Sequence, residues 1–164
     1  IGAYTALVNG LLKPDRFGSI IVLSGAFMRD RVIEAVESHS PRKRRYYERF
    51  FGDIDTVIGS DKDYVAIVDK FRNNPELPKP RFYVACGLHD NLCQNNRDLV
   101  RLLKSADFDV TYWEPEIGAH EWPFWNAWID CALDWYAPGE LRPSSANVDY
   151  TALTELRPPD KQRR

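Results

Sequence analysis

Two side chains that can exchange protons, Asp90 and His120, each follow an apolar stretch of this sequence. Residues 81–86 form a β-branched and aromatic run shortly before Asp90, and residues 110–113 form a similar run before His120. Such runs predict strands, and the loops after successive parallel strands lie at the same edge of a sheet. An imidazole can exchange a proton near neutral pH, and a carboxylate bonded to it fixes its tautomer. We therefore interpret Asp90 and His120 as the acid and base of a catalytic site that still needs a nucleophile.

The elements around this pair alternate between strand and helix. Apolar residues at helical spacing predict a helix over 95–106, between the two strands, and another over about 121–136, directly after His120. We expect the second helix to bury Trp125, Trp128, Ile129, Ala132 and Tyr136. A strand, a helix and a further strand in this order form a βαβ unit with parallel strands.

The first half of the chain predicts the same alternation. Residues 1–12 have helical spacing and end before Pro14, because the residue preceding a proline is pushed out of the α region. Residues 19–23 are continuously apolar, as in a buried parallel strand, and a further helix follows the acidic N-cap segment 60–63. Between them, segment 27–58 is polar with scattered aromatic residues, and we interpret it as helical turns that form a cap.

Together these elements predict an α/β fold with parallel strands and helices on both faces. We interpret residues 1–137 as one domain that includes the cap segment 27–58, whereas 138–164 is rich in Pro, Ser and charge and is expected to be a flexible extension. Three strands are visible, and a parallel sheet of that size leaves an apolar edge open. We therefore expect the chain to form part of a larger sheet, in which strand 19–23 has a further neighbour.

The overall composition excludes several classes of protein. With 44% hydrophobic and 28% charged residues, the 164-residue chain can bury a core. Its net charge of −2 gives no general attraction to nucleic acid or an anionic membrane, and no apolar run approaches the ~20 residues of a membrane span. Three cysteines at irregular spacing do not suggest a disulfide framework, and no signal peptide is visible. We expect a cytoplasmic protein without nucleic-acid or membrane partners, and we leave homo-oligomerisation open.

Two other clusters carry side chains that could bind ligands. Cys86, His89 and Cys93 have metal-ligating atoms, but a fourth ligand at normal spacing is missing, so we expect no metal site. Cys86 is instead interpreted as a small buried apolar residue, and His89 as a loop residue beside the acid. The basic run 42–45 could contact phosphates, although a solvated cap helix is the better explanation.

Two further aspartates and a tryptophan are candidates for roles in the site. Asp107 and Asp109 compete with Asp90 for the role of the acid, but they precede a predicted strand rather than follow one. Trp122 belongs to an aromatic group that we expect to be mainly core. Its position next to His120 also suggests that it lines a substrate pocket.

Several motifs, in the same order along the chain, resemble one esterase family of the α/β-hydrolases. They are Pro14-Asp15-Arg16-Phe17-Gly18, Leu23-Ser24-Gly25-Ala26, Phe51-Gly52-Asp53, Gly59-Ser60-Asp61-Lys62-Asp63, Cys86-Gly87-Leu88-His89-Asp90, Asn95-Asn96-Arg97 and Gly118-Ala119-His120-Glu121-Trp122-Pro123-Phe124-Trp125. The family includes tributyrin-type short-chain esterases, S-formylglutathione hydrolase (esterase D) and feruloyl esterases. The motifs resemble the C-terminal half of its members, best in the tributyrin-esterase branch, and the resemblance covers residues 1 to about 137. It implies the C-terminal part of an α/β-hydrolase fold, whose catalytic residues follow the order Ser, Asp, His.

The resemblance implies a role for each part of the catalytic site. The nucleophilic Ser would lie one position before Ile1, outside this sequence, because the first two residues match the end of the family's G-x-S-x-G motif. Asp90 and His120 would complete a Ser-His-Asp triad, and the backbone N–H of Ile1 would be one oxyanion donor. Trp122 and Phe27, the first residue of the cap segment, would line the substrate pocket. The implied protein is a carboxylesterase for short acyl esters that needs no cofactor, acts on a small-molecule ester and has the N-terminal half of the same domain as its partner.

Two other functions stay open on the sequence alone. The sequence contains no nucleophile at the expected position, as in an inactive fragment or a pseudoenzyme. A stand-alone α/β binding module is the remaining hypothesis, and the open sheet edge disfavours it. Among substrates, a thioester, an acetylated sugar and an aryl ester are all compatible with these residues.

Overall fold

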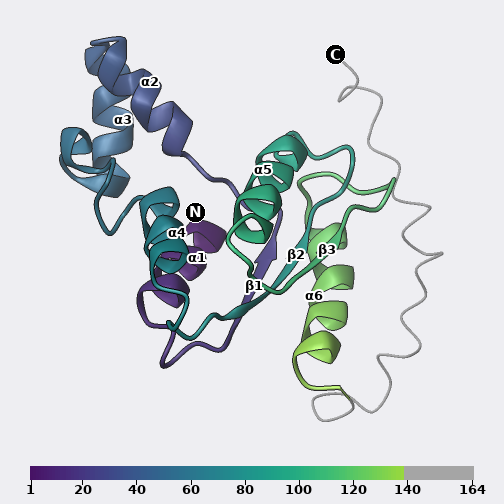
Figure 1. The fold of residues 1–164 in the computed structure, drawn as a ribbon. Coiled ribbons are helices and arrows are strands. Elements are labelled where there is room, and N and C mark those ends of the chain that lie inside the picture. Colours follow the sequence, from purple (N-terminus) through teal and green to yellow (C-terminus); the bar gives the residue numbers. More distant parts are fainter. Residues whose placement is uncertain (139–164) are drawn as a thin grey trace.

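The computed structural model describes residues 1–138, which form a parallel sheet flanked by helices (Figure 1). The elements are α1 (Gly2–Leu12), β1 (Ser19–Leu23), α2 (Arg29–Glu37), α3 (Pro41–Phe51), the 3-10 helix η1 (Ile54–Thr56), α4 (Tyr64–Asn73), β2 (Arg81–Ala85), α5 (Cys93–Lys104), β3 (Val110–Trp113) and α6 (Trp122–Tyr136). Their order is the one that the sequence predicts. The expected extension 138–164 lies, apart from its first residue, outside the described residues.

The sheet has the strand order β1-β2-β3, with parallel pairing throughout. Ser19 pairs with Arg81 at the start of β1 and β2, and Phe82 pairs with Val110 at the start of β3. The central strand β2 is covered on both faces, and its residues 82–85 are at most 1% exposed. This burial explains why β2 reads as a continuous apolar run rather than an alternating one.

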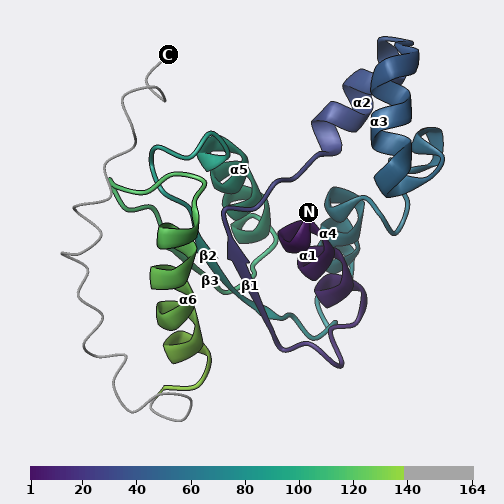
Figure 2. The same cartoon turned by 180° about the vertical axis from the view of Figure 1, so that it is seen from behind.

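Helices cover both faces of the sheet, as Figures 1 and 2 show: α1, α4 and α5 lie on one side and α6 on the other. Alternate residues of β2 point to opposite faces, so Phe82 and Val84 join the core under α1, α4 and α5, whereas Tyr83 and Ala85 join the core under α6. Helix α1 approaches β1 closely at Gly10, where an added Cβ would lie 2.4 Å from the Ile20 side chain. A larger residue there would push α1 away from the sheet.

Helix α6 differs from the expectation in the side chains that it buries. Phe124, Trp128 and Ala132, spaced four residues apart, face the sheet, and Phe124 is fully buried. The predictions for Ile129 and Tyr136 are wrong, because these residues are 37% and 50% exposed and lie to one side of that stripe. Neither α6 nor any other helix within residues 1–138 combines the length and apolar character needed to cross a bilayer.

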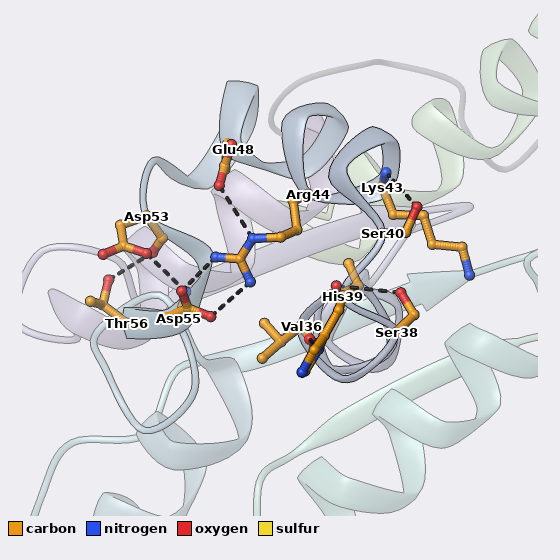
Figure 3. A network of polar contacts seen from close by, with 11 residues as sticks. Val36, Ser38, His39, Ser40, Lys43, Arg44, Glu48, Asp53, Asp55 and Thr56 are labelled. Atoms are coloured by element: carbon orange, nitrogen blue, oxygen red, sulfur yellow. Dashed lines mark hydrogen bonds and ion pairs between the residues drawn. The ribbon is translucent and has the colours of Figure 1, made fainter.

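The helices α2 and α3 project away from the sheet, beyond the end of β1 (Figures 1 and 2). Ion pairs hold this region together: the Arg44 guanidinium donates to Asp55 of η1 (Nη1–Oδ1 3.0 Å) and lies 3.8 Å from Glu48 (Figure 3). The region is fastened to α1 by an edge-on contact between the rings of Phe51 and Tyr4, 5.3 Å apart. The helices α2, α3 and η1 lie within segment 27–58, where helical turns were expected. The role of this segment as a cap, and its bounds, stay a prediction.

The outer edge of β1 is open within residues 1–138. Ile20 and Val22 are buried against α1, whereas Ile21 and Leu23 are partly exposed on the side of α6. An apolar groove of about 480 Å³ runs along this edge, between β1 and α1. β1 is therefore an edge strand in residues 1–138, and the expectation that a further strand lies beside it stays a prediction.

Candidate active site

Asp90 and His120, thirty residues apart in sequence, are in hydrogen-bond contact. The distance from His120 Nδ1 to Asp90 Oδ2 is 3.0 Å. The Asp90 side chain is fully buried, while that of His120 is 47% exposed. A buried carboxylate bonded to one ring nitrogen can orient a solvent-facing imidazole, so that its other nitrogen is free to accept a proton. The prediction that the two residues meet is confirmed, whereas their catalytic roles belong to the proposal below.

Two glycines allow the loops after β2 and β3 to approach each other closely. A Cβ added at Gly87 would lie 2.2 Å from the carbonyl oxygen of Gly118, which is too close for any side chain to be accommodated. Gly118 itself has φ +104°, a conformation that favours glycine. The pairing of the strands continues into these loops, since the N–H of Leu88 donates to the carbonyl of Pro115 at 2.9 Å. Backbone contact between the loops therefore determines how the acid and the imidazole meet.

The two oxygens of Asp90 have different partners. Oδ1 accepts a hydrogen bond from the backbone N–H of Leu92 at 2.8 Å, while Oδ2 faces His120. The backbone carbonyl of Asp90 also accepts from the N–H of Cys93, the first residue of α5, at 3.0 Å. The buried carboxylate is thus bonded through both oxygens, and α5 fixes the orientation in which it meets the imidazole.

The ring of His120 is supported by aromatic residues of α6. It packs edge-on against Trp125, with ring centroids 4.9 Å apart, and Trp125 in turn contacts Trp122 at 5.2 Å. When Nδ1 carries the proton, it donates to Asp90 and leaves Nε2 unprotonated as the base. Trp122 is 73% exposed, so its role in a substrate pocket stays a prediction.

The expected oxyanion donor, Ile1, lies at the N-terminus of α1 and is 59% exposed. It lines a small pocket of about 220 Å³ between α1 and the cap, to which the cap contributes Met28, Phe50 and Phe51. Phe27 does not line this pocket: it is only 4% exposed and packs against Tyr64, with ring centroids 5.6 Å apart. The pocket role of Phe27 stays a prediction, and the structure adds Met28 and Phe50 as candidates beside Ile1.

The two cysteines near the acid, Cys86 and Cys93, are buried thiols. Burial raises the pKa of the Cys86 thiol well above its usual range, and the negative charge of Asp90 adds to the effect. Burial also raises the pKa of the Cys93 thiol. His89 is exposed on the acid loop. Among residues 1–138 there is no cluster of three or more metal-ligating side chains.

The two competing aspartates lie away from the Asp90–His120 pair. Asp107 and Asp109 are exposed at the opposite end of β3 from His120. Within the basic run 42–45, Lys43 pairs with Glu34 and Arg44 with Asp55. Two of the four basic side chains of the run are thus paired with carboxylates of the cap region itself.

A second polar cluster, not predicted from the sequence, joins α5 to the end of β3. Arg97 Nε donates to Glu114 Oε2 at 2.7 Å, and the hydroxyl of Tyr112 donates to the same oxygen at 2.5 Å. These bonds, the one from Arg97 above all, lower the pKa of Glu114 to about 2. The cluster fixes the strand end that precedes the His120 loop to the helix that follows the Asp90 loop.

This lowered pKa predicts how stability depends on pH. A carboxyl group whose pKa is lower in the folded state stabilises the fold above its unfolded pKa of about 4.5, and this contribution is lost as the pH falls towards about 2. We expect Glu114→Gln to remove this part of the acid sensitivity, measured as the free energy of unfolding by urea between pH 5 and pH 2.5. Glu116→Gln, at an exposed neighbouring position, should retain the wild-type dependence. Identical slopes for wild type and Glu114→Gln would contradict the assignment.

Asn95 and Asn96 had no predicted role beyond the start of a helix. In the structure α5 begins two residues earlier, at Cys93, and both side chains point back to the segment after β1. Two consecutive asparagines in the first turns of a helix are poor helix formers. That mismatch is the signal by which a role in hydrogen bonding could have been suspected.

Comparison with known proteins gives sequence relatives and structural neighbours for most of the described region. No protein-family model matches the sequence. Over 137 residues the chain is 41% identical to an acetyl esterase from Caldicellulosiruptor saccharolyticus, a match that covers 82% of this chain and 51% of that protein.

Two solved structures from Staphylococcus aureus have a similar fold. One is S-formylglutathione hydrolase (FrmB), with a TM-score of 0.62 and 23% identity, and the other is the fluorophosphonate-binding serine hydrolase FphF with bound substrate, with a TM-score of 0.62 and 24% identity. Each match covers 82% of this chain and 50% of the other chain. The chain therefore spans about half the length of the relatives that it matches.

Proposed function

We propose that this chain, which has part of an α/β-hydrolase fold of the esterase type, supplies the acid and base of a serine carboxylesterase. In this proposal Asp90 is the acid that orients His120, and His120 is the general base. The reaction is acyl transfer from an ester to a serine and then to water. It needs no cofactor, because the imidazole moves the proton and backbone N–H groups stabilise the oxyanion.

The observation that carries this proposal is the contact between Asp90 and His120. Its distance of 3.0 Å joins two residues on the loops that follow adjacent parallel strands. In open α/β sheets, ligands bind at this edge. The order acid, then histidine, along the chain is that of the α/β-hydrolases, in which the serine comes first.

The nucleophile in this proposal is a serine immediately before Ile1. Ile1 lies at the N-terminus of α1, where the backbone N–H groups and the helix dipole favour a negative charge. The residue after the nucleophile of an α/β-hydrolase supplies one oxyanion donor from its backbone. The proposal therefore requires Nε2 of His120 to face the position that precedes Ile1.

The substrate class in this proposal is an ester with a short acyl group. Support comes from the pocket beside Ile1, which measures about 220 Å³ and is lined by apolar side chains such as Met28 and Phe50. Pockets for drug-sized ligands are larger, roughly 300–1,000 Å³. A small apolar pocket next to the oxyanion site favours an acetyl to butyryl group over a long chain.

The partner in this proposal is the N-terminal half of the same hydrolase domain, which would add a strand beside β1. The carbonyl of Gly18 accepts from Arg81 at 3.0 Å and the N–H of Ser24 donates to Ala85 at 2.9 Å, so both face β2. Because alternate residues of a parallel strand bond to the same neighbour, the odd-numbered residues 19, 21 and 23 direct their backbone groups outward. The apolar groove along this edge gives such a strand an apolar surface to cover.

Labelling with a fluorophosphonate probe tests the proposed nucleophile. We expect a form that includes the residues naturally preceding Ile1 to hydrolyse p-nitrophenyl acetate and to be labelled on the serine next to Ile1, located by peptide mass spectrometry. A form that begins at Ile1 should do neither, because an acyl-enzyme cannot form without the hydroxyl. Robust turnover by a preparation whose mass shows that it begins at Ile1 would refute the proposal that the nucleophile is a serine immediately before Ile1. Failure of the longer form to react would leave an inactive protein or a binding module.

A further inference from the structure

The side chains of Asn95 and Asn96 bind the backbone of the segment that leads from β1 into the cap. Asn96 Oδ1 accepts from the N–H of Gly25, and its Nδ2 donates to the carbonyl of Gly25, both at 2.9 Å. Asn95 makes the corresponding pair with Phe27: Oδ1 accepts from the N–H at 2.5 Å and Nδ2 donates to the carbonyl at 3.2 Å. The two amides thus bond to alternate residues of the segment, as the backbone of a neighbouring strand would.

The four hydrogen bonds of Asn95 and Asn96 to this segment form a clamp. The bonds of Asn96 are costly to break, because water cannot take their place. Asn96 is fully buried, and a buried amide or peptide group without a partner costs about 1–3 kcal/mol. A Cβ at Gly25 would lie 2.4 Å from the ring of Phe27, so a larger residue there would displace that ring. The cap segment therefore leaves the sheet from a backbone position that α5 determines.

Asn96, unlike Asn95, also reaches the acid loop. Its Nδ2 donates a second hydrogen bond, of 2.8 Å, to the carbonyl of Leu92. The N–H of the same Leu92 donates to Oδ1 of Asp90 at 2.8 Å. One buried amide is therefore bonded on one side to Gly25, in the segment that leads into the cap, and on the other to Leu92, which bonds to the carboxylate of Asp90.

We propose that Asn96 is a positioning residue, which fixes the Asp90 loop to Gly25 in the segment that leads into the cap, whereas Asn95 fixes only the start of the cap, at Phe27. Its effect on catalysis rests on the function proposed above, but its effect on the contact between Asp90 and His120 does not. A displacement of the cap is transmitted through Gly25 and Leu92 to the carboxylate. Asp90 is then correctly placed for His120 only while the cap keeps the position seen in this structure.

The matched variants Asn96→Ala and Asn95→Ala separate the two roles. In the full-length protein labelled with ¹⁵N-histidine, we expect the hydrogen-bonded Nδ1–H signal of His120, assigned by its absence in His120→Gln, to be retained in Asn95→Ala and lost or broadened in Asn96→Ala. In ester hydrolysis, Asn96→Ala should lower kcat by about 10²-fold, the effect of a misplacement of about 1 Å. Asn95→Ala should change mainly KM, through the cap.

The spectroscopic signal keeps this test independent of the proposed function, because it needs no turnover. If esterase activity is absent but the His120 signal responds as described, the positioning role of Asn96 is supported and the proposed esterase function is rejected. An unchanged His120 signal in a folded Asn96→Ala variant overturns the positioning role. Should Asn96→Ala fail to fold, amide hydrogen exchange of the wild type decides instead: strong protection of the N–H groups of Gly25 and Leu92 supports the clamp, and exchange as in an unstructured chain overturns it.

Discussion

Replacement of His120 by glutamine in the full-length protein is expected to lower kcat for ester hydrolysis by about 10⁴- to 10⁶-fold. The reason is that the variant lacks the proposed base: in the function proposed above, His120, which contacts the buried Asp90, takes the proton of the nucleophile. Glutamine keeps the polarity and approximate length of the side chain but cannot act as a base near neutral pH. Steady-state kinetics with p-nitrophenyl acetate measure the loss.

His89→Gln is the matched control for this experiment. His89 lies one residue before Asp90 on the same loop and is exposed, so any metal or nonspecific effect of a histidine near the site would appear there. We expect this variant to keep kcat within about twofold of the wild type, as surface substitutions usually do. A loss of similar size in both variants would point to a disturbed loop rather than to a lost base. A His120→Gln variant with nearly full activity would contradict the triad.

The proximity of Asp90 and His120 could be predicted, because the order of the strands and the residues of the loops that follow them can be read from local sequence. The apolar runs of β2 and β3 identify adjacent parallel strands, and the loops that follow such strands share one edge of the sheet. That rule brought Asp90 and His120 to one edge of the sheet, and the family motifs around them singled them out from other residues such as His89. The helices could also be predicted, since the apolar spacing of α1, α4 and α5 is strong and α1 ends at Leu12, two residues before Pro14.

Contacts that depend on the path of a loop or on long side chains were not predictable in this way. The errors at Ile129 and Tyr136 arose because an apolar residue on a helix can lie beside the buried stripe as well as in it, and only packing against the sheet decides. Glu114 meets Arg97 across seventeen positions of sequence, and Asn96 meets Gly25 across seventy-one. Such contacts follow from the way in which α5 packs on one face of the sheet, which no local sequence pattern contains.

Asp90→Asn is expected to lower kcat of the full-length protein by about 10⁴-fold while the fold is kept. The geometry gives the reason. Oδ1 must remain an oxygen, because it accepts from the N–H of Leu92, so the new amide nitrogen takes the place of Oδ2 and donates to Nδ1 of His120. The imidazole then carries its proton on Nε2 and cannot act as the base.

The exposed Asp109 provides the matched control. Asp109→Asn makes the same chemical change at the residue before β3, at the opposite end of that strand from the His120 loop, and should leave kcat and the melting temperature unchanged within error. For Asp90→Asn, a melting temperature close to that of the wild type together with a collapsed kcat separates a wrong tautomer from unfolding. Activity within about tenfold of the wild type in a folded Asp90→Asn variant would mean that another acid orients His120, since a substituted triad aspartate costs about 10⁴-fold elsewhere. The contact at 3.0 Å would then be structural rather than catalytic.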